Sequence, residues 1–409
     1  MLPRSRSRPC RRFYCAPSRE SPGSAASSTG RIRARALCMT PAPPRAAATI
    51  VGMTHTISRS FVPTLLAAVP SALGFHPRDS VVIAPLVGHE TRGFLRLDLP
   101  GPVDLDAVAA TAVGHVCRVA EADAMIVIVY TDAPLRDGDG LAYDAFVAAI
   151  GERADACGLG VMGELCVAND GWAPYDDPAP RPLVEIAGDR PAAASQHEGT
   201  TIPPGPLLER TEARQRHARL GLLGDPFLLT EPGEDPDLAM LVRAPHDLFE
   251  SAFAGEPPAP RRAALWHWVL ASPALRDIVL TQWAGGRAEA VRTFAWQRAW
   301  HEGAPEAPTF PLRLGGEGRR PDARRLRAAL GFARELTALA DGAPRGACLV
   351  ACAWLSWALG ASTHAAAYAE QALAEDPLLS LADLILRMTD GGMLPEWVYA
   401  EDGTARDAL

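Results

Sequence analysis

The chain contains no lysine: all 40 of its basic residues are arginine, and Asn169 is its single asparagine. Schiff-base catalysis, the phosphate-binding loop of many nucleotide hydrolases and the ATP site of protein kinases each require a lysine amine. These three classes of chemistry are therefore excluded. The chain also lacks the Gly-x-Ser-x-Gly turn that carries the nucleophile of many serine hydrolases.

Cysteine pairs with the two-residue spacing of zinc and redox motifs are absent. Five of the eight cysteines fall in predicted helices or strands: Cys117, Cys157, Cys166, Cys348 and Cys352. This pattern predicts reduced, buried thiols and a cytoplasmic protein. Long apolar runs are absent too. The stretch at 61–73 contains two prolines and is too short to cross a bilayer, so we expect no membrane partner.

Acidic residues are scarce at the start of the chain and abundant afterwards. Residues 1–52 carry ten arginines against Glu20 alone, whereas the remaining residues carry 30 basic and 47 acidic side chains. The excess of acidic side chains in residues 53–409 argues against nucleic acid as a partner. The first 52 residues are rich in Arg, Ser and Pro without apolar periodicity, so we expect a disordered extension, with Met53 as the natural start. Residues 401–409 are expected to be a disordered tail.

What the chain does contain between residues 53 and 170 is a regular alternation of strand and helix patterns. Apolar runs or period-two alternation predict strands at 81–86, 92–99, 125–130 and 160–167, and helical periodicity predicts helices at 61–73, 104–120 and 141–157. After the first helix the order is β-β-α-β-α-β, which predicts a mixed α/β sheet. The first two strands form a hairpin, and the helical crossovers keep the second, third and fourth strands parallel.

Polar side chains gather at one edge of this predicted sheet. Because the first strand runs opposite to the others, its start lies beside their carboxyl ends, where open α/β sheets bind ligands. The candidate ligand-binding residues are His76, Arg78, Asp79 and Ser80 before the first strand, and Asp98, Asp132 and Asp170 after the later strands.

Several interpretations of this edge are open. The leading one is a ligand-binding or regulatory protein, for which the sequence identifies no cofactor and no catalytic residue. The alternative is a metal-assisted hydrolase that uses Asp79, Asp98, Asp132 and His76, because hard cations take carboxylate oxygens. Aspartates also end strands simply because they favour turns. Arg78 and Arg92 either neutralise the edge, clamp an anionic ligand or are solvated.

The second half of the chain has a different pattern. Residues 171–206 form a proline-rich linker or loop, and residues 207–400 are predicted to be an all-α domain. From Arg345 to Pro377 the chain resembles a single tetratricopeptide hairpin with Gly360 at its turn. One such hairpin cannot bury its own apolar face, so it must dock on the preceding helices. The tryptophans here, including Trp296 and Trp300, fit either the core or a partner groove, so a protein partner is expected through this half.

The chain from about Thr54 to Ala400 resembles the actinobacterial family of the domain of unknown function 4192. The most specific feature is the loop Leu73-Gly74-Phe75-His76-Pro77, followed by Asp79-Ser80. The segments 96–100, 124–132 and 372–377 continue the resemblance. It implies a bacterial cytosolic protein of the architecture predicted above, and it implies no reaction. The cysteine-rich stretch of some family members is missing at 171–177, which leaves no metal role for that stretch.

Overall fold

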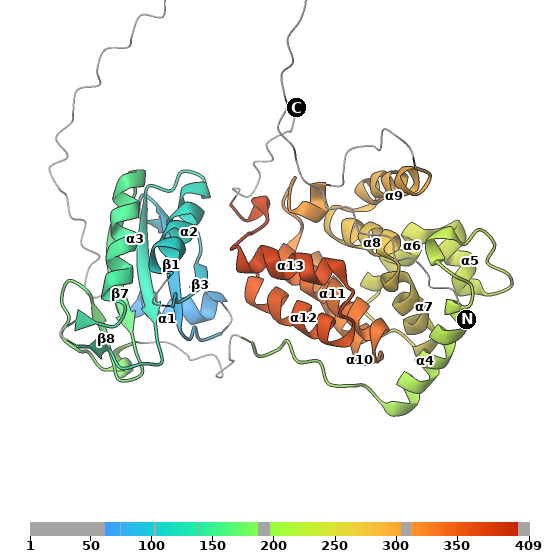
Figure 1. The fold of residues 1–409 in the computed structure, drawn as a ribbon, viewed down its shortest axis with the longest axis horizontal. Coiled ribbons are helices and arrows are strands. Elements are labelled where there is room, and N and C mark those ends of the chain that lie inside the picture. Colours follow the sequence, from blue (N-terminus) through green and yellow to red (C-terminus); the bar gives the residue numbers. More distant parts are fainter. Residues whose placement is uncertain are drawn as a thin grey trace, which may run out of the picture. The chain divides into compact units, whose positions relative to one another are not determined.

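The computed structural model describes residues 62–73, 75–101, 104–138, 140–186, 197–303 and 312–399. The expected disordered extension at 1–52, the start at Met53 and the tail at 401–409 lie outside these ranges. Within them, a mixed sheet with its helices is followed by an all-helical region (Figure 1), which confirms the predicted fold class.

Six strands of the described residues form the main sheet, in the order β2-β1-β4-β7-β8, with β3 also paired to β1. Their bounds are Ser80–Val87 (β1), Glu90–Thr91 (β2), Leu95–Asp98 (β3), Ala124–Tyr130 (β4), Gly160–Val167 (β7) and Trp172–Pro174 (β8). β1 is antiparallel to β3 and to β4, whereas β4 and β7 are parallel. β3, β4 and β7 therefore run in one direction, which confirms the predicted strand directions.

The register brings the predicted polar ends together. Ser80, the first residue of β1, lies opposite Asp98 on one side and Tyr130 on the other. Tyr130 in turn lies opposite Val167 of β7. The carboxyl ends of β3, β4 and β7 thus meet the start of β1 at one edge of the sheet.

The structure differs from the expected elements in three places. The second strand is split into β2 and β3, because Gly93 takes a φ of 114° that favours glycine and interrupts the pairing. A small hairpin of β5 (Arg136–Asp137) and β6 (Gly140–Leu141) fills the predicted loop before the third helix. β8 lies within the stretch assigned to the linker and extends the sheet beyond β7.

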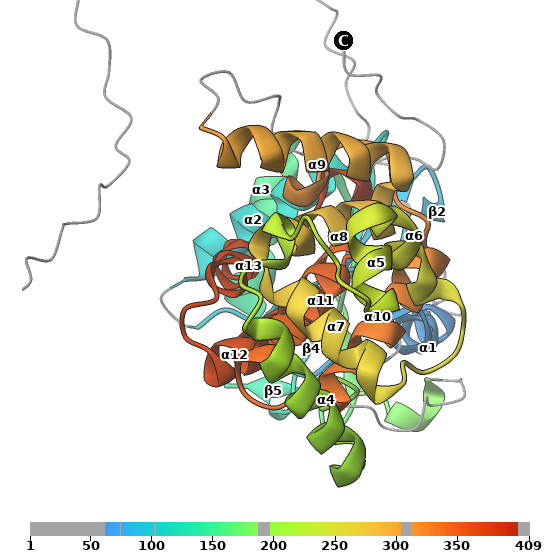
Figure 2. The same ribbon diagram turned by 90° about the vertical axis from the view of Figure 1, so that its right-hand side faces the viewer.

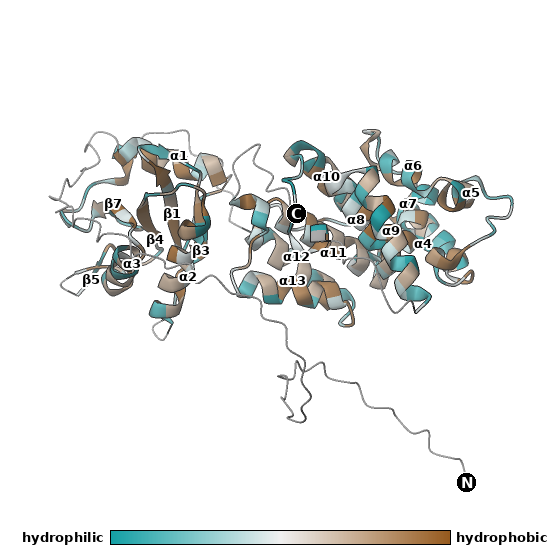
Figure 3. Ribbon diagram, turned by 90° about the horizontal axis from the view of Figure 1, so that it is seen from above, coloured by the Kyte–Doolittle hydropathy of each residue, from teal (hydrophilic) through white to brown (hydrophobic). Residues whose placement is uncertain are grey.

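Helices cover both faces of the sheet. α1 (Val62–Leu73) packs on the face that carries Val82 and Ile128. α2 (Leu105–Arg118) and α3 (Asp144–Cys157) pack on the opposite face. β1 and β4 are apolar on both faces, as their hydrophobic colouring in Figure 3 shows, so both strands are buried between the helix layers.

The all-helical region comprises ten α-helices within the described residues. Their bounds are Leu207–Gly221 (α4), Pro236–Arg243 (α5), Pro245–Glu250 (α6), Pro260–Ala271 (α7), Pro273–Gly285 (α8), Arg287–His301 (α9), Ala323–Ala338 (α10), Ala343–Ala358 (α11), Ser362–Glu375 (α12) and Ser380–Asp390 (α13). α4 packs beside α7, and α9 packs on α8 (Figure 2). No helix of the described residues combines the length and apolarity needed to cross a membrane.

Aromatic side chains form the centre of this helical core. The rings of Trp266, Trp283 and Phe332 contact one another with centroids 5.2–6.2 Å apart. His267 is almost completely buried, and burial lowers its pKa to about 4 while its Nε2 bonds the carbonyl oxygen of Leu336 at 2.9 Å. The neutral imidazole therefore donates, and the Trp266-His267-Trp268 run is core.

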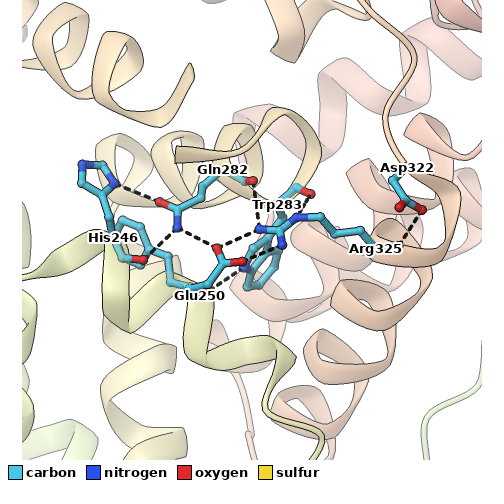
Figure 4. A network of polar contacts seen from close by, with 7 residues as sticks. His246, Glu250, Gln282, Trp283, Asp322 and Arg325 are labelled. Carbon is cyan, nitrogen blue, oxygen red and sulfur yellow. Dashed lines mark hydrogen bonds and ion pairs between the residues drawn. The ribbon is translucent and has the colours of Figure 1, made fainter. Parts of the chain in front are cut away.

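A polar network joins three helices (Figure 4). Glu250 of α6 accepts from Nη1 and Nη2 of Arg325 of α10, at 2.6 and 2.8 Å. Arg325 Nε also donates to the carbonyl oxygen of Trp283, and Gln282 of α8 donates to Glu250. Bonding to Arg325 lowers the pKa of Glu250. The bidentate pair and its neighbours fix α6, α8 and α10 to one another.

The cysteines divide into two groups. Cys166, Cys348 and Cys352 are buried, as expected. Cys117 and Cys157 are exposed, so the prediction of buried thiols is wrong for these two. Both lie in the last turn of their helices, where the side chains leave the packed layer.

The predicted tetratricopeptide-like hairpin is present as α11 and α12. Gly360 forms its turn with a φ of 82°. The hairpin packs against α10, α7 and α13, so its apolar face is covered as expected. Gly346 of α11 allows a close approach, because a Cβ there would lie 2.9 Å from Leu379 Cδ1 and 3.2 Å from the carbonyl oxygen of Ala372.

We predict opposite effects for two glycine substitutions in neighbouring helices. Gly346→Ala lowers the free energy of unfolding by up to about 2 kcal/mol, because the new methyl group overpacks the contact with α12 and α13. Gly331→Ala on the exposed face of α10 meets no neighbouring atom, and it raises the free energy of unfolding by about 0.5–1 kcal/mol through helix propensity. Urea denaturation of both variants measures the difference. Equal effects would contradict the close-packing role of Gly346.

Candidate functional site

Asp79 holds two strand ends together. Its Oδ1 accepts from the backbone N–H of Asp132 at 3.1 Å and from Thr131 Oγ1 at 3.3 Å. The backbone of Asp79 is left-handed, with a φ of 41°. Such a conformation is uncommon for a residue with a side chain, although aspartate and asparagine tolerate it better than most because their short polar side chains bond locally. Asp79 therefore connects the start of β1 to the loop after β4.

Ser80 is a structural residue of this edge. Its side chain is completely buried, its Oγ donates to the carbonyl oxygen of Arg78 at 2.6 Å and it accepts from Arg96 Nε at 2.8 Å. Arg96 also pairs with Asp98, which lies two residues further along β3. The Ser80 hydroxyl thus donates its proton to a backbone carbonyl, whereas a serine nucleophile donates it to a general base.

Arg78, which precedes β1, and Asp132, which follows β4, form an exposed ion pair at this edge of the sheet. Arg78 Nε donates to Asp132 Oδ2 at 2.9 Å, and its Nη2 donates to the same oxygen. Their side chains are 61% and 48% exposed. This bond raises the pKa of Arg78, which stays positively charged. An exposed pair of this kind contributes little to stability.

Asp170 and Asn169 organise the loop after β7. Asp170 Oδ1 accepts from the backbone N–H of Leu135 at 2.8 Å. Asn169 Nδ2 donates to the carbonyl oxygen of Asp132 at 2.6 Å. These bonds tie the loops after β4 and β7 to each other, which is the turn role that aspartate and asparagine commonly take.

Two further residues of the sequence analysis are Arg92 and His76. Arg92 lies at the far end of β1, where its backbone N–H donates to the carbonyl oxygen of Pro85, so of the open interpretations neutralising or clamping at the edge does not fit its position. His76 lies half-buried in the segment before β1. It lies two residues before Arg78 in the sequence.

The carboxylates of the edge do not converge as metal ligands. Asp79, Asp98, Asp132 and Asp170 each bond a different partner, and no three His, Cys, Asp or Glu side chains of the described residues are grouped to hold a cation. Two of these carboxylates, Asp98 and Asp132, bond an arginine, and the other two bond a backbone N–H.

Tyr143 is a residue of this region that the sequence pattern does not indicate. It precedes α3 with a left-handed φ of 63°. Burial, and after it the charge of Asp79, raises the pKa of the Tyr143 phenol. No spacing rule in the sequence links positions 79 and 143.

The family model described as "Domain of unknown function (DUF4192)" matches residues 63–312. The chain belongs to this family. The match covers the whole sheet with its helices and the first part of the helical region, and the hairpin of α11 and α12 lies beyond it. No curated protein and no solved structure matches the chain closely enough to show a relationship. Conclusions about its chemistry therefore come from its own residues.

We predict that Asp79 is required for the stability of the edge through its oxygens and not its charge. Asp79→Ala loses two hydrogen bonds and places alanine in a left-handed conformation, which together lower the free energy of unfolding by about 1–3 kcal/mol. Asp79→Asn keeps an acceptor and tolerates this backbone, so it costs less than about 1 kcal/mol. Urea denaturation measures both changes.

The matched control is Asp155→Ala, an exposed aspartate in the last turn of α3. It should change stability by no more than about 0.5 kcal/mol. If Asp79→Ala behaves like this control, the bonds of Asp79 do not hold the edge.

Proposed function

We propose that this DUF4192 family member is a cytoplasmic ligand-binding or regulatory protein whose ligand site is the edge formed by the start of β1 and the ends of β3, β4 and β7. The observation that carries the proposal is the exposed Arg78–Asp132 pair at the carboxyl end of parallel β4. Open α/β sheets bind ligands at this position. The free cysteines of the described residues support the cytoplasmic location.

The division of roles at the edge supports binding. Asp79, Ser80 and Asp170 are occupied with bonds that fix the loops. Arg78 and Asp132 are held on this frame but remain open to solvent. A rigid frame beneath a few exposed polar groups is the arrangement that binding sites require.

The chemistry of Arg78 favours an oxyanion as the ligand. A guanidinium presents a planar fork that matches a carboxylate or a phosphate with two parallel hydrogen bonds. Because the exposed pair contributes little to stability, a ligand oxyanion can take the position of Asp132 at small cost. Asp132 is then free to accept from a donor on the same ligand. We therefore propose a small carboxylate or phosphate that also carries a hydrogen-bond donor.

A thermal-shift screen of carboxylates and phosphate esters tests the proposal. A ligand present at 100 times its dissociation constant stabilises the folded protein by about 2.7 kcal/mol, which raises the melting temperature measurably. Arg78→Ala should abolish this shift without lowering the melting temperature of the free protein. The matched control is Arg153→Ala, which removes an exposed arginine of α3. Its Nη2 lies 3.9 Å from Asp106 Oδ1. A hit that persists in Arg78→Ala and is lost in Arg153→Ala would contradict the site.

A metal-assisted hydrolase is not favoured by any specific observation. The aspartates that motivated it each have separate partners, and the Ser80 hydroxyl is bonded to Arg78 and Arg96.

An exposed aromatic pair supports the regulatory part of the proposal. Trp296 and Trp300 of α9 stack with their ring centroids 6.0 Å apart, and Trp300 is 68% exposed. The other tryptophans of the helical core are buried. Exposed tryptophan is rare on a monomer and common at the centre of protein interfaces. We propose that α9 is the surface through which the helical region contacts a protein partner.

We predict that Trp300→Ala weakens the capture of a specific partner from a native extract at least tenfold, since an anchoring tryptophan commonly supplies about 2 kcal/mol or more. Leu378→Ala is the control, because Leu378 is 90% exposed and lies between α12 and α13. A pull-down in which both variants retain the same partner, or in which no partner is retained by the unaltered protein, would contradict the role of α9.

A further inference from the structure

Two exposed cysteines lie at equivalent places on neighbouring helices. Cys117 is in the last turn of α2, and Cys157 is the last residue of α3. Neither takes part in the polar edge described above. The remaining cysteines of the described residues, Cys166, Cys348 and Cys352, are buried.

The topology of the sheet places these two helix ends side by side. α2 leads into β4 and α3 leads into β7, and both helices cover the same face of the sheet. β4 and β7 are parallel and begin in register, with Ala124 opposite Gly160. The backbone N–H of Gly160 also donates to the carbonyl oxygen of Asp123 at 2.9 Å. Because both helices lead into adjacent parallel strands from the same face, their C-terminal ends lie at the same end of the sheet.

Packing brings the two helix ends close to each other. α2 and α3 pack against each other on the same face of the sheet. Burial raises the pKa of the Cys117 thiol, and the neighbouring Cys157 thiol raises it further. A disulfide between them would close the loop that contains β4 and all of α3.

We propose that Cys117 and Cys157 are a reversible dithiol–disulfide site that links the C-terminal ends of α2 and α3 when the protein meets a small-molecule disulfide. The thiolate of one cysteine attacks a sulfur of the small disulfide, forms a mixed disulfide and releases one small thiol. The second thiolate then attacks the cysteine sulfur of the mixed disulfide and releases the other small thiol. The two cysteines lose two protons and two electrons, and the small disulfide gains both.

The site is separate from the proposed ligand edge. Cys117 and Cys157 precede the starts of β4 and β7, whereas Asp132 and Asp170 follow their ends. Oxidation therefore constrains the opposite end of the same two strands. The helix–helix contact that it locks is already present in the reduced protein, so the link needs no rearrangement of the sheet.

Intact-mass spectrometry of the full chain tests the proposal. Cys10, Cys15 and Cys38, which lie outside the described residues, are first replaced by serine, and the folded protein is incubated with oxidised glutathione. We expect the mass to fall by two hydrogen atoms without a glutathione adduct, and dithiothreitol to reverse the change. The reaction should accelerate as the pH rises toward the pKa of the Cys117 thiol, because the thiolate is the attacking species.

Single variants separate a paired site from two independent thiols. In Cys117→Ser or Cys157→Ser the remaining exposed thiol has no partner to resolve the mixed disulfide, so one glutathione adduct should accumulate. Cys166→Ser is the control and should still lose two hydrogen atoms. Circular dichroism confirms that each variant is folded. Glutathione adducts on the parent protein, or the absence of any reaction, would overturn the proposal.

Discussion

β1 is hydrogen-bonded on both sides, to β3 and to β4, and it is antiparallel to both. The polar edge depends on this arrangement, because only an antiparallel β1 begins where β3 and β4 end. The register is held by burial on both faces: Val82 faces α1, whereas Val81 and Ile83 face α2 and α3. A slip of one residue would exchange these faces and would also separate Asp79 from the loop after β4.

The polar groups at this edge have two kinds of task, and their hydrogen-bond partners separate them. Asp79 and Ser80 satisfy backbone and side-chain groups of the edge, so they hold the loops in place. Arg78 and Asp132 form an ion pair that is exposed to solvent. Because such a pair contributes little to stability, a ligand can replace Asp132 as the partner of Arg78. Because the chain has no lysine, every cationic contact here is a guanidinium, which favours planar oxyanions over a simple point charge.

Strong local patterns account for the parts of the fold that were predictable. The strands predicted at 125–130 and 160–167 are β4 and β7 with nearly the expected bounds. β4 is a continuous apolar run of strand length that is buried along its whole length, which makes its pattern strong. The convergence of strand ends followed from the hairpin and the helical crossovers alone. The small strand β8 was not predictable, because Trp172–Pro174 lies among turn residues and its pairing with β7 is decided by tertiary contacts.

The site itself was only partly predictable for a related reason. The sequence indicates which residues reach the edge, but their partners depend on distances between strands. Asp79 therefore bonds the backbone of Asp132 instead of sharing a cation with its carboxylate. Likewise the exposure of Cys117 and Cys157 could not be read from a helical pattern, because both lie at the point where the helix leaves the packed layer.

Amide hydrogen exchange of the loop after β4 tests the central claim, that Asp79 fixes this loop to the start of β1. The Asp132 amide donates to the Asp79 carboxylate, whereas the adjacent Thr131 amide donates to the carbonyl oxygen of Val167. The account predicts that Asp79→Ala makes the Asp132 amide exchange rapidly while the Thr131 amide stays protected. Equal protection of the Asp132 amide in the variant and the unaltered protein would contradict it.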